Sequence, residues 1–204
     1  MTRKEIKSTA KLNLKKRLGI SLLANIICDI ITAVSSSFFA FIGLIFAGPL
    51  EVGLQKIYYK NSQHEMPKLK DLFSPFQENF GETFLLGLLT RVFLLFWTLL
   101  LIVPGIIKSY SYAMSGYLLM RNPELGAIES INQSRKLMDG EKWNLFKLDL
   151  SFIGWILLGI ITLGIGFIFI TPYIFECRTV FFNELYDRKF LAPETVSEEI
   201  PVAA

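Results

Sequence analysis

The sequence has 204 residues, of which 52% are hydrophobic and 14% aromatic, and its formal net charge is +3. Its uncharged apolar runs approach the length of roughly 20 residues that a helix needs to cross about 30 Å of hydrocarbon. Composition therefore favours an all-α, polytopic membrane protein and disfavours a soluble all-α bundle.

The N-terminal segment, residues 1–17, carries seven Lys or Arg residues against one acid. We expect a helix here, because its apolar positions fall on one stripe: Ile6, Ala10, Leu14 and Leu18. The apolar run that follows is too long for a signal peptide and has no convincing cleavage site, so the helix should be retained. A basic amphipathic helix beside a membrane run favours contact with anionic lipids. Nucleic acid is disfavoured, because no aromatic stacking platform accompanies the basic residues.

The next thirty residues, Leu18–Ala47, contain one charge, Asp29. They allow one long tilted helix or a hairpin that turns near Ser35–Ser37. The hairpin is favoured, because it returns the lysines that follow to the side of the basic N-terminus. Its second helix would run from about Phe38 to Tyr59.

Residues Asn61–Gly81 read as a polar loop. Phe84–Val103 is the clearest membrane span and is interrupted only by Arg91. A tight turn at Pro104 and Gly105 should send the chain back through a hydroxyl-rich helix, 106–120. Such a helix should face other helices rather than lipid, since buried hydroxyl groups need partners.

An elbow that lies along the cytoplasmic membrane surface is predicted between residues 122 and 150. Asn122, Pro123 and Glu124 form a typical helix start, and Gly140 should end that helix. The residues that mark this elbow are Asn122, Pro123, Arg135, Gly140 and Trp143.

The last apolar segment, Ser151–Phe175, should contain a turn at Thr162–Gly166. Basic residues then gather on one side, which predicts six transmembrane helices arranged as three hairpins, with both termini cytoplasmic, in the plasma membrane. We expect one integral membrane domain over residues 18–190, and a disordered tail over 191–204.

Charges at membrane depth are costly, at about 2.5–3.5 kcal/mol each, so they mark candidate functional positions. Five residues qualify: Asp29, Arg91, Lys108, Glu176 and Arg178. Asp29 could pair with Arg91 or Lys108 in a polar pathway for an ion or small solute, or in a structural bridge. Snorkelling of Lys108 to the interface is favoured. Glu176 and Arg178 are two apart on a helix and should not pair directly.

Enzyme motifs are missing from the sequence, and no histidine–cysteine cluster suggests a metal or cofactor. The two cysteines, Cys28 and Cys177, lie in apolar segments and read as small buried side chains rather than a disulfide. We therefore expect a protein that is not an enzyme and has no cofactor.

Three stretches carry a family resemblance: WTLLLIVPGIIKSYS, NPELGAIESINQSRKLMDG and LDLSFIGWILLGIITLGIG. Through them the chain resembles a family of uncharacterised bacterial integral membrane proteins, known by its domain of unknown function, from about Met1 to Leu185. It is also distantly similar to the membrane domain of some glycerophosphodiester phosphodiesterases. The resemblance implies a fold and a membrane location, and no activity.

The leading hypothesis is a non-enzymatic accessory or scaffold for membrane proteins or lipids. Its partners would be membrane lipids, anionic at the cytoplasmic face, and a membrane protein, with no nucleic acid. The alternative is a small transporter or permease-like subunit, favoured by Asp29, Arg91 and the hydroxyl-rich helix.

Overall fold

The computed structural model describes residues 2–15, 17–38, 40–162 and 164–191, and within these ranges the regular structure is entirely helical. The all-α prediction is therefore confirmed for the described part of the chain. The first elements are α1 (Arg3–Leu14), α2 (Leu18–Phe38), α3 (Ala40–Ser62), α4 (Leu69–Glu78), α5 (Phe80–Leu100), α6 (Ile102–Tyr112) and α7 (Ser115–Arg121). The later ones are η1 (Pro123–Leu125), α8 (Gly126–Leu137), α9 (Lys142–Leu150), α10 (Ile153–Ile161), α11 (Ile165–Tyr186) and η2 (Asp187–Leu191).

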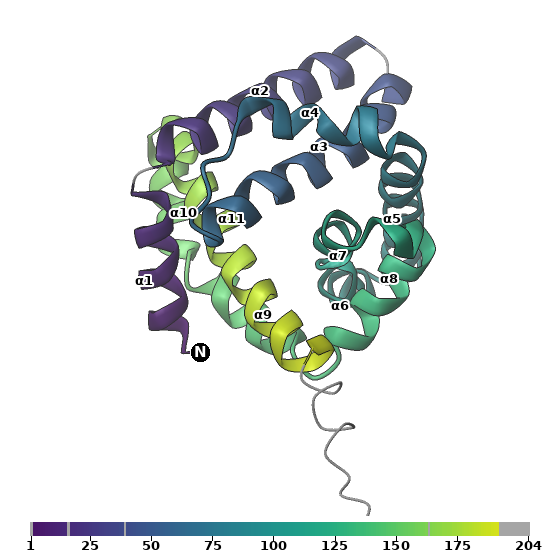
Figure 1. The fold of residues 1–204 in the computed structure, drawn as a ribbon. Coiled ribbons are helices and arrows are strands. Elements are labelled where there is room, and N and C mark those ends of the chain that lie inside the picture. The colour runs from purple at the N-terminus through teal and green to yellow at the C-terminus, as the bar shows by residue number, and fades with distance from the viewer. Residues whose placement is uncertain (1, 16, 39, 163, 192–204) are drawn as a thin grey trace, which may run out of the picture.

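Helices α2 and α3 form an antiparallel pair that lies side by side in Figure 1. The amide nitrogen of Asn61 donates to the hydroxyl of Ser21 at 2.8 Å, and that of Asn25 donates to Tyr58 one turn further along. The chain thus turns back as the hairpin interpretation expected. Helix α2 continues through Ser35–Ser37 to Phe38 and α3 begins at Ala40, so the reversal follows directly after the serines. Local propensity is a weak signal that a longer helix can override.

Two glycines let α3 and α5 approach until their backbones touch. A Cβ atom on Gly48 would lie 2.2 Å from the carbonyl oxygen of Thr83, and one on Gly87 would lie 2.5 Å from the Cα atom of Gly48. Only hydrogen fits between these backbones, which is the packing that small residues permit between helices.

The short helix α7 lies in the middle of the ring of helices in Figure 1. Ser115, Tyr117, Leu118 and Leu119 are all buried, and α7 packs against α3 and α8. The second part of the hydroxyl-rich helix, α7, therefore faces other helices, as expected, whereas Ile106 and Ile107 in its first part are about half exposed. It is divided, however, since the residues between Tyr112 and Ser115 form a turn that separates α6 from α7.

The predicted elbow helix begins later than Asn122. Pro123 starts the short 3₁₀ turn η1, and Gly126, with φ of 68°, follows η1 directly and is the first residue of α8. The expected cap at Asn122 is absent, and a distant residue replaces it: Glu82 of α5 accepts the backbone N–H of Ala127 at 2.6 Å. The stop at Gly140 is confirmed by its φ of 77°.

The prediction of six membrane-spanning helices is wrong. Among the described residues two segments are long and apolar enough to cross a membrane: α5 (Phe80–Leu100) and the run of α9 and α10 (Lys142–Ile161). Several helices expected to span are short or carry charges, as in the divided α6 and α7. The second segment includes Lys142–Leu150, which the sequence assigned to the interfacial elbow.

The N-terminal helix packs along α11, with Ile6, Ala10 and Leu14 of the expected stripe buried and Leu18 more exposed at the start of α2. The turn expected at Thr162–Gly166 is present, since Gly164 has φ of 91° between α10 and α11. The expected tail, apart from Leu191, lies outside the described residues.

Candidate functional site

A polar cavity of about 560 Å³ lies between α2, α3, α5, α6 and α11. Four charged side chains line it: Asp29, Glu51, Arg91 and Arg178. Hydroxyl and amide groups also line the cavity, for example those of Thr90, Thr171 and Gln55, and apolar side chains complete the lining. Polar groups of both charge signs thus face one cavity inside a largely apolar chain.

The glycine contact between α3 and α5 determines where Glu51 and Arg91 stand. Each follows its glycine, Gly48 or Gly87, by about one helical turn, so the two side chains leave their helices close to the crossing. The guanidinium of Arg91 donates to the carbonyl oxygen of Gly87 at 3.1 Å. Both side chains are accessible to solvent although their helices touch, because they face the cavity.

The other two charges of the cavity differ in how they are paired. The guanidinium of Arg178 donates two hydrogen bonds to the carboxylate of Asp149 in α9, at 3.0 Å and 2.7 Å, in a bidentate ion pair. Asp29 makes no hydrogen bond or ion pair within the described ranges, and the same holds for Glu51. The cavity therefore presents two carboxylates that are not neutralised by direct contact, beside two guanidinium groups.

The structure brings three of the five predicted polar residues, Asp29, Arg91 and Arg178, to this cavity. The side-chain ammonium of Lys108 instead lies 4.6 Å from the centre of the Trp97 ring, on the outer surface. There it lines a cleft together with Arg135, Lys136 and Lys142. Lys108 therefore lies close to the basic residues of the predicted elbow.

The fifth residue, Glu176, is fully buried and lies away from the cavity lining. Its carboxylate accepts hydrogen bonds from the amide nitrogens of Asn13, at 3.0 Å, and Asn61, at 3.3 Å. It therefore joins α1, α3 and α11. Arg178, two residues further along α11, contacts Asp149. Sequence reasoning missed both asparagines, although each is an isolated amide on an otherwise apolar helix face.

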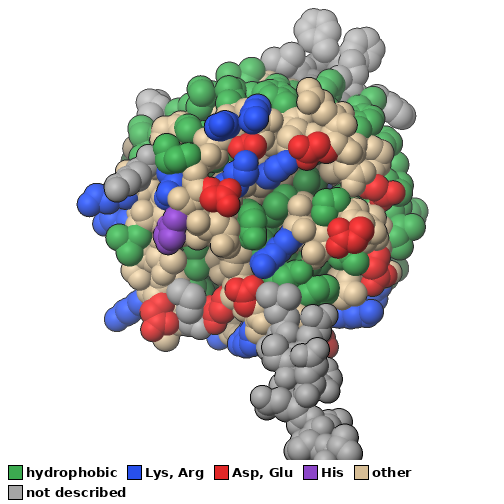
Figure 2. Space-filling model, viewed as in Figure 1, with side chains coloured by type: hydrophobic (Ala, Val, Ile, Leu, Met, Phe, Trp, Pro, Cys, Tyr) green, Lys and Arg blue, Asp and Glu red, His purple; other side chains and the backbone are tan. Residues whose placement is uncertain are grey.

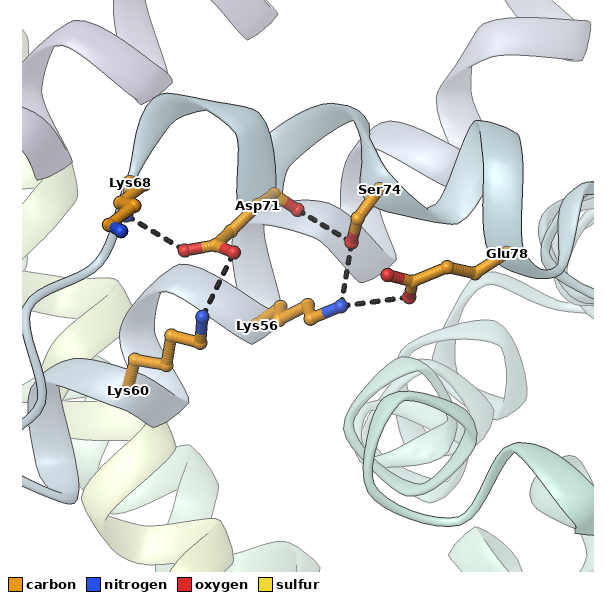
Figure 3. Close-up of polar contacts among 6 residues, drawn as sticks. All are labelled: Lys56, Lys60, Lys68, Asp71, Ser74 and Glu78. Carbon is orange, nitrogen blue, oxygen red and sulfur yellow. Dashed lines mark hydrogen bonds and ion pairs between the residues drawn. The ribbon is translucent and has the colours of Figure 1, made fainter.

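A second charged cluster ties α3 to α4, as Figure 3 shows. The carboxylate of Asp71 accepts the backbone N–H of Lys68 at 2.7 Å and the ammonium of Lys60 at 2.9 Å. Lys56 donates to the hydroxyl of Ser74 at 2.7 Å and to Glu78 at 2.8 Å. Burial raises the pKa of Asp71, but these two donors and the nearby lysine charges outweigh burial, so the pKa lies below its ordinary value.

The residues of the predicted elbow do not form one site. Asn122 donates to the hydroxyl of Tyr186 at 3.0 Å, while Pro123 opens the turn η1. Arg135 lines the cleft with Lys108, and Trp143 is 64% exposed and stacks on Phe146. Asn122 and Pro123 therefore shape the chain, whereas Arg135 and Trp143 offer a cation and an aromatic ring to the surroundings.

No cluster of three or more metal-ligating side chains occurs in the part of the chain that the structure describes. Cys28 and Cys177 are both buried and free, as their positions in apolar segments predicted. The charged and polar side chains that line the cavity can make electrostatic and hydrogen-bonding interactions.

Comparison with protein families matches residues 99–189 to a model described as protein of unknown function (DUF975). The match covers the chain from the end of α5 to η2 and indicates no activity. It shows neither the quoted motifs nor the similarity to the membrane domain of glycerophosphodiester phosphodiesterases. No curated protein and no solved structure matches the chain.

Proposed function

We propose that this chain is a membrane-embedded, non-enzymatic accessory protein that binds lipids or membrane-protein partners through its charged side. The observation that carries the proposal is the concentration of exposed apolar side chains around the end of α5 and the start of α6. Leu99 is 81% exposed, and its neighbours in this region share that exposure: Leu95, Phe96, Leu100, Leu101, Ile102 and Val103. Contiguous apolar surface of this kind marks contact with a membrane or a partner.

The low burial of the two apolar segments supports a membrane rather than a soluble core. Only 17% of the apolar window in α5 and 22% of that in α9 and α10 is buried. The core helix of a soluble protein would be mostly buried. Lipid provides the apolar surroundings that these helices do not find within the chain.

The rest of the surface supports a side that faces water and headgroups. Figure 2 shows Lys, Arg, Asp and Glu side chains mixed across the face turned to the viewer, with hydrophobic side chains toward its upper and right-hand edges. Basic residues of α1 add to this charge. Such a division between charged and apolar surface suits a protein whose charged side meets anionic headgroups.

Extraction from cell membranes with alkaline carbonate tests the membrane part of this proposal. We expect the full chain to remain in the pellet, and its recovery in the supernatant would overturn the proposal. In-cell crosslinking followed by identification of the crosslinked species tests the accessory role. A reproducible protein or lipid partner is the expected result.

A second function, passage of a small charged solute, is favoured by the polar cavity with its unpaired carboxylates. A flux assay in proteoliposomes tests it, with Asp29→Asn as the variant. Flux that Asp29→Asn abolishes would favour this function over the accessory role. Absence of flux across a broad panel of ions and small solutes would count against it.

A further inference from the structure

An apolar groove of about 800 Å³ lies between the N-terminal helix α1 and the helices α10 and α11. Its walls are largely apolar: Leu12, Leu14, Leu18, Trp155, Phe169 and Ile170. Two lysines, Lys11 of α1 and Lys15 directly after its last residue, line the same groove. The groove therefore combines a hydrocarbon-like surface with two positive charges.

Several walls of this groove are apolar side chains left accessible by the rest of the chain. Leu12 is 69% exposed, Phe169 is 59% exposed and Trp155 is 53% exposed. These residues come from three different helices, so the exposure is a property of the groove and not of one helix end. Covering them with an apolar partner would remove their surface from water.

The helix that forms one wall is fixed firmly to the others. The hydroxyl of Tyr173 donates to the carbonyl oxygen of Lys7, and the ammonium of Lys7 donates to the carbonyl oxygen of Ser151, both at 3.3 Å. That ammonium also lies 4.3 Å from the centre of the Phe152 ring. Together with the Asn13–Glu176 hydrogen bond, these contacts preform the groove.

Lys11 and Lys15 differ from Lys7 in having no such contacts. Lys7 is held by the junction between α9 and α10, whereas the ammonium groups of Lys11 and Lys15 form no hydrogen bond or ion pair within the described residues. Ser8, Lys11 and Lys15 share one face of α1, because they recur at helical spacing. Two uncompensated cations beside an apolar groove complement a ligand with an anionic head and an apolar chain.

We propose that this groove binds one anionic phospholipid, with an acyl chain against Leu12, Trp155 and Phe169 and the phosphate near Lys11 and Lys15. The proposal rests on the membrane location proposed above. It narrows the general contact with lipids to one site and one lipid class. Arg and Lys near an anionic surface contribute about 1 kcal/mol each, which corresponds to about a fivefold change in binding per lysine.

Photolabelling tests the site. The full chain is reconstituted in phosphatidylcholine vesicles that contain a phosphatidylglycerol probe with a photoactivatable group in its acyl chain, and labelled peptides are mapped by mass spectrometry. A phosphatidylcholine probe with the same chain serves as the reference. We expect labelling at residues of the groove, with preference for the anionic probe.

The variant Lys11→Ala/Lys15→Ala should reduce that preference roughly 30-fold. The variant Leu12→Gln/Phe169→Gln should reduce labelling by both probes. Lys70→Ala/Lys136→Ala, which removes two exposed lysines outside the groove, is the matched control and should keep the preference. Size-exclusion chromatography and circular dichroism confirm that each variant is folded.

Three results would overturn the proposal: equal labelling of the groove by the anionic and the phosphatidylcholine probe, an equal loss of preference in the control, or crosslinks between two copies of the chain in place of lipid. Carbonate extraction separates this failure from that of the proposed function. A chain that stays in the membrane but is not labelled in the groove contradicts the lipid site alone. A chain that is washed out contradicts the membrane location itself.

Discussion

The two halves of α5 have opposite surroundings although both are apolar. In the first half, Thr83, Leu86 and Gly87 are buried against neighbouring helices. In the second half, Leu95 and Leu99 are 66% and 81% exposed. Hydropathy alone does not distinguish the two halves. In the structure one half is packed against other helices, whereas the apolar side chains of the other half are exposed. The same contrast separates the hydrogen-bonded region around Glu176 from the exposed end formed by α5 and α6.

The largest effect is expected where the packed half of α5 contacts the backbone of α3 at Gly48. Gly48→Leu would force a side chain into a position where a Cβ atom alone lies 2.2 Å from Thr83 oxygen. We expect a loss of more than about 4 kcal/mol in the free energy of unfolding, or no folded protein. Gly154→Leu in α10 is the control, because a Cβ atom there meets nothing within 4 Å. Denaturant unfolding in detergent measures both, and equal losses would contradict the contrast between the two regions.

A smaller effect should follow from loss of the buried carboxylate. Glu176→Leu leaves the amide nitrogens of Asn13 and Asn61 without their buried acceptor, at a cost of about 3 kcal/mol. Glu176→Gln keeps one acceptor oxygen and should cost less. Unfolding curves in detergent measure the difference. A Glu176→Leu protein as stable as the parent would show that this junction does not hold α1 in place.

The substitution Asp71→Asn weakens the charged link between α3 and α4, because the hydrogen bonds from Lys60 and Lys68 lose their charged acceptor. We expect it to lower the free energy of unfolding by about 2 kcal/mol. The pKa of Asp71 is lowered in the folded chain, so its stabilisation is complete above the ordinary aspartate pKa of about 3.9. It is lost as the pH falls through the lower, native pKa.

Unfolding of parent and Asp71→Asn protein across an acid series checks this pH dependence. The difference in stability should be constant near neutral pH and should shrink only in acid. A difference that shrinks as the pH rises above neutral would contradict the direction assigned to this pKa.

The smallest effect is expected at the exposed end. Lys108→Ala removes the contact with the Trp97 ring and should cost about 0.5–1 kcal/mol. Lys108→Arg should retain it, because a guanidinium also stacks on aromatic faces. Tryptophan fluorescence during unfolding follows the loss. A cost as large as that of Glu176→Leu would show that the exposed end is held as tightly as the packed half.

Sequence patterns located the elements well where local chemistry decides them. The span over α5, the turn at Gly164 and the stop at Gly140 follow from apolar length and from glycine at positive φ, both readable from neighbouring residues. The cost of charge in apolar helices marked Asp29 and Arg91 as candidate residues, and both line one cavity. Their direct pairing stays a prediction.

Features that depend on distant contacts could not be read in this way. The cap at Ala127 comes from Glu82, and the hydrogen-bond donors to Glu176 come from α1 and α3. Glu51 was overlooked because it lies next to the end of an apolar run and takes its importance from the crossing at Gly48 and Gly87. The predicted number of membrane-spanning helices was wrong for a related reason. Hydropathy does not show whether an apolar helix is surrounded by other helices of the chain or by lipid.

The cap that Glu82 provides makes the position of α8 depend on the depth of α5. The carboxylate lies near the start of α5 and accepts the backbone N–H of Ala127 at 2.6 Å, in the first turn of α8, where a helix has donors without internal partners. A shift of α5 along its axis by a single turn, about 5.4 Å, would withdraw the carboxylate and leave these donors uncapped. In the membrane location proposed above, a change in bilayer thickness that moves α5 would therefore be transmitted to the first turn of α8.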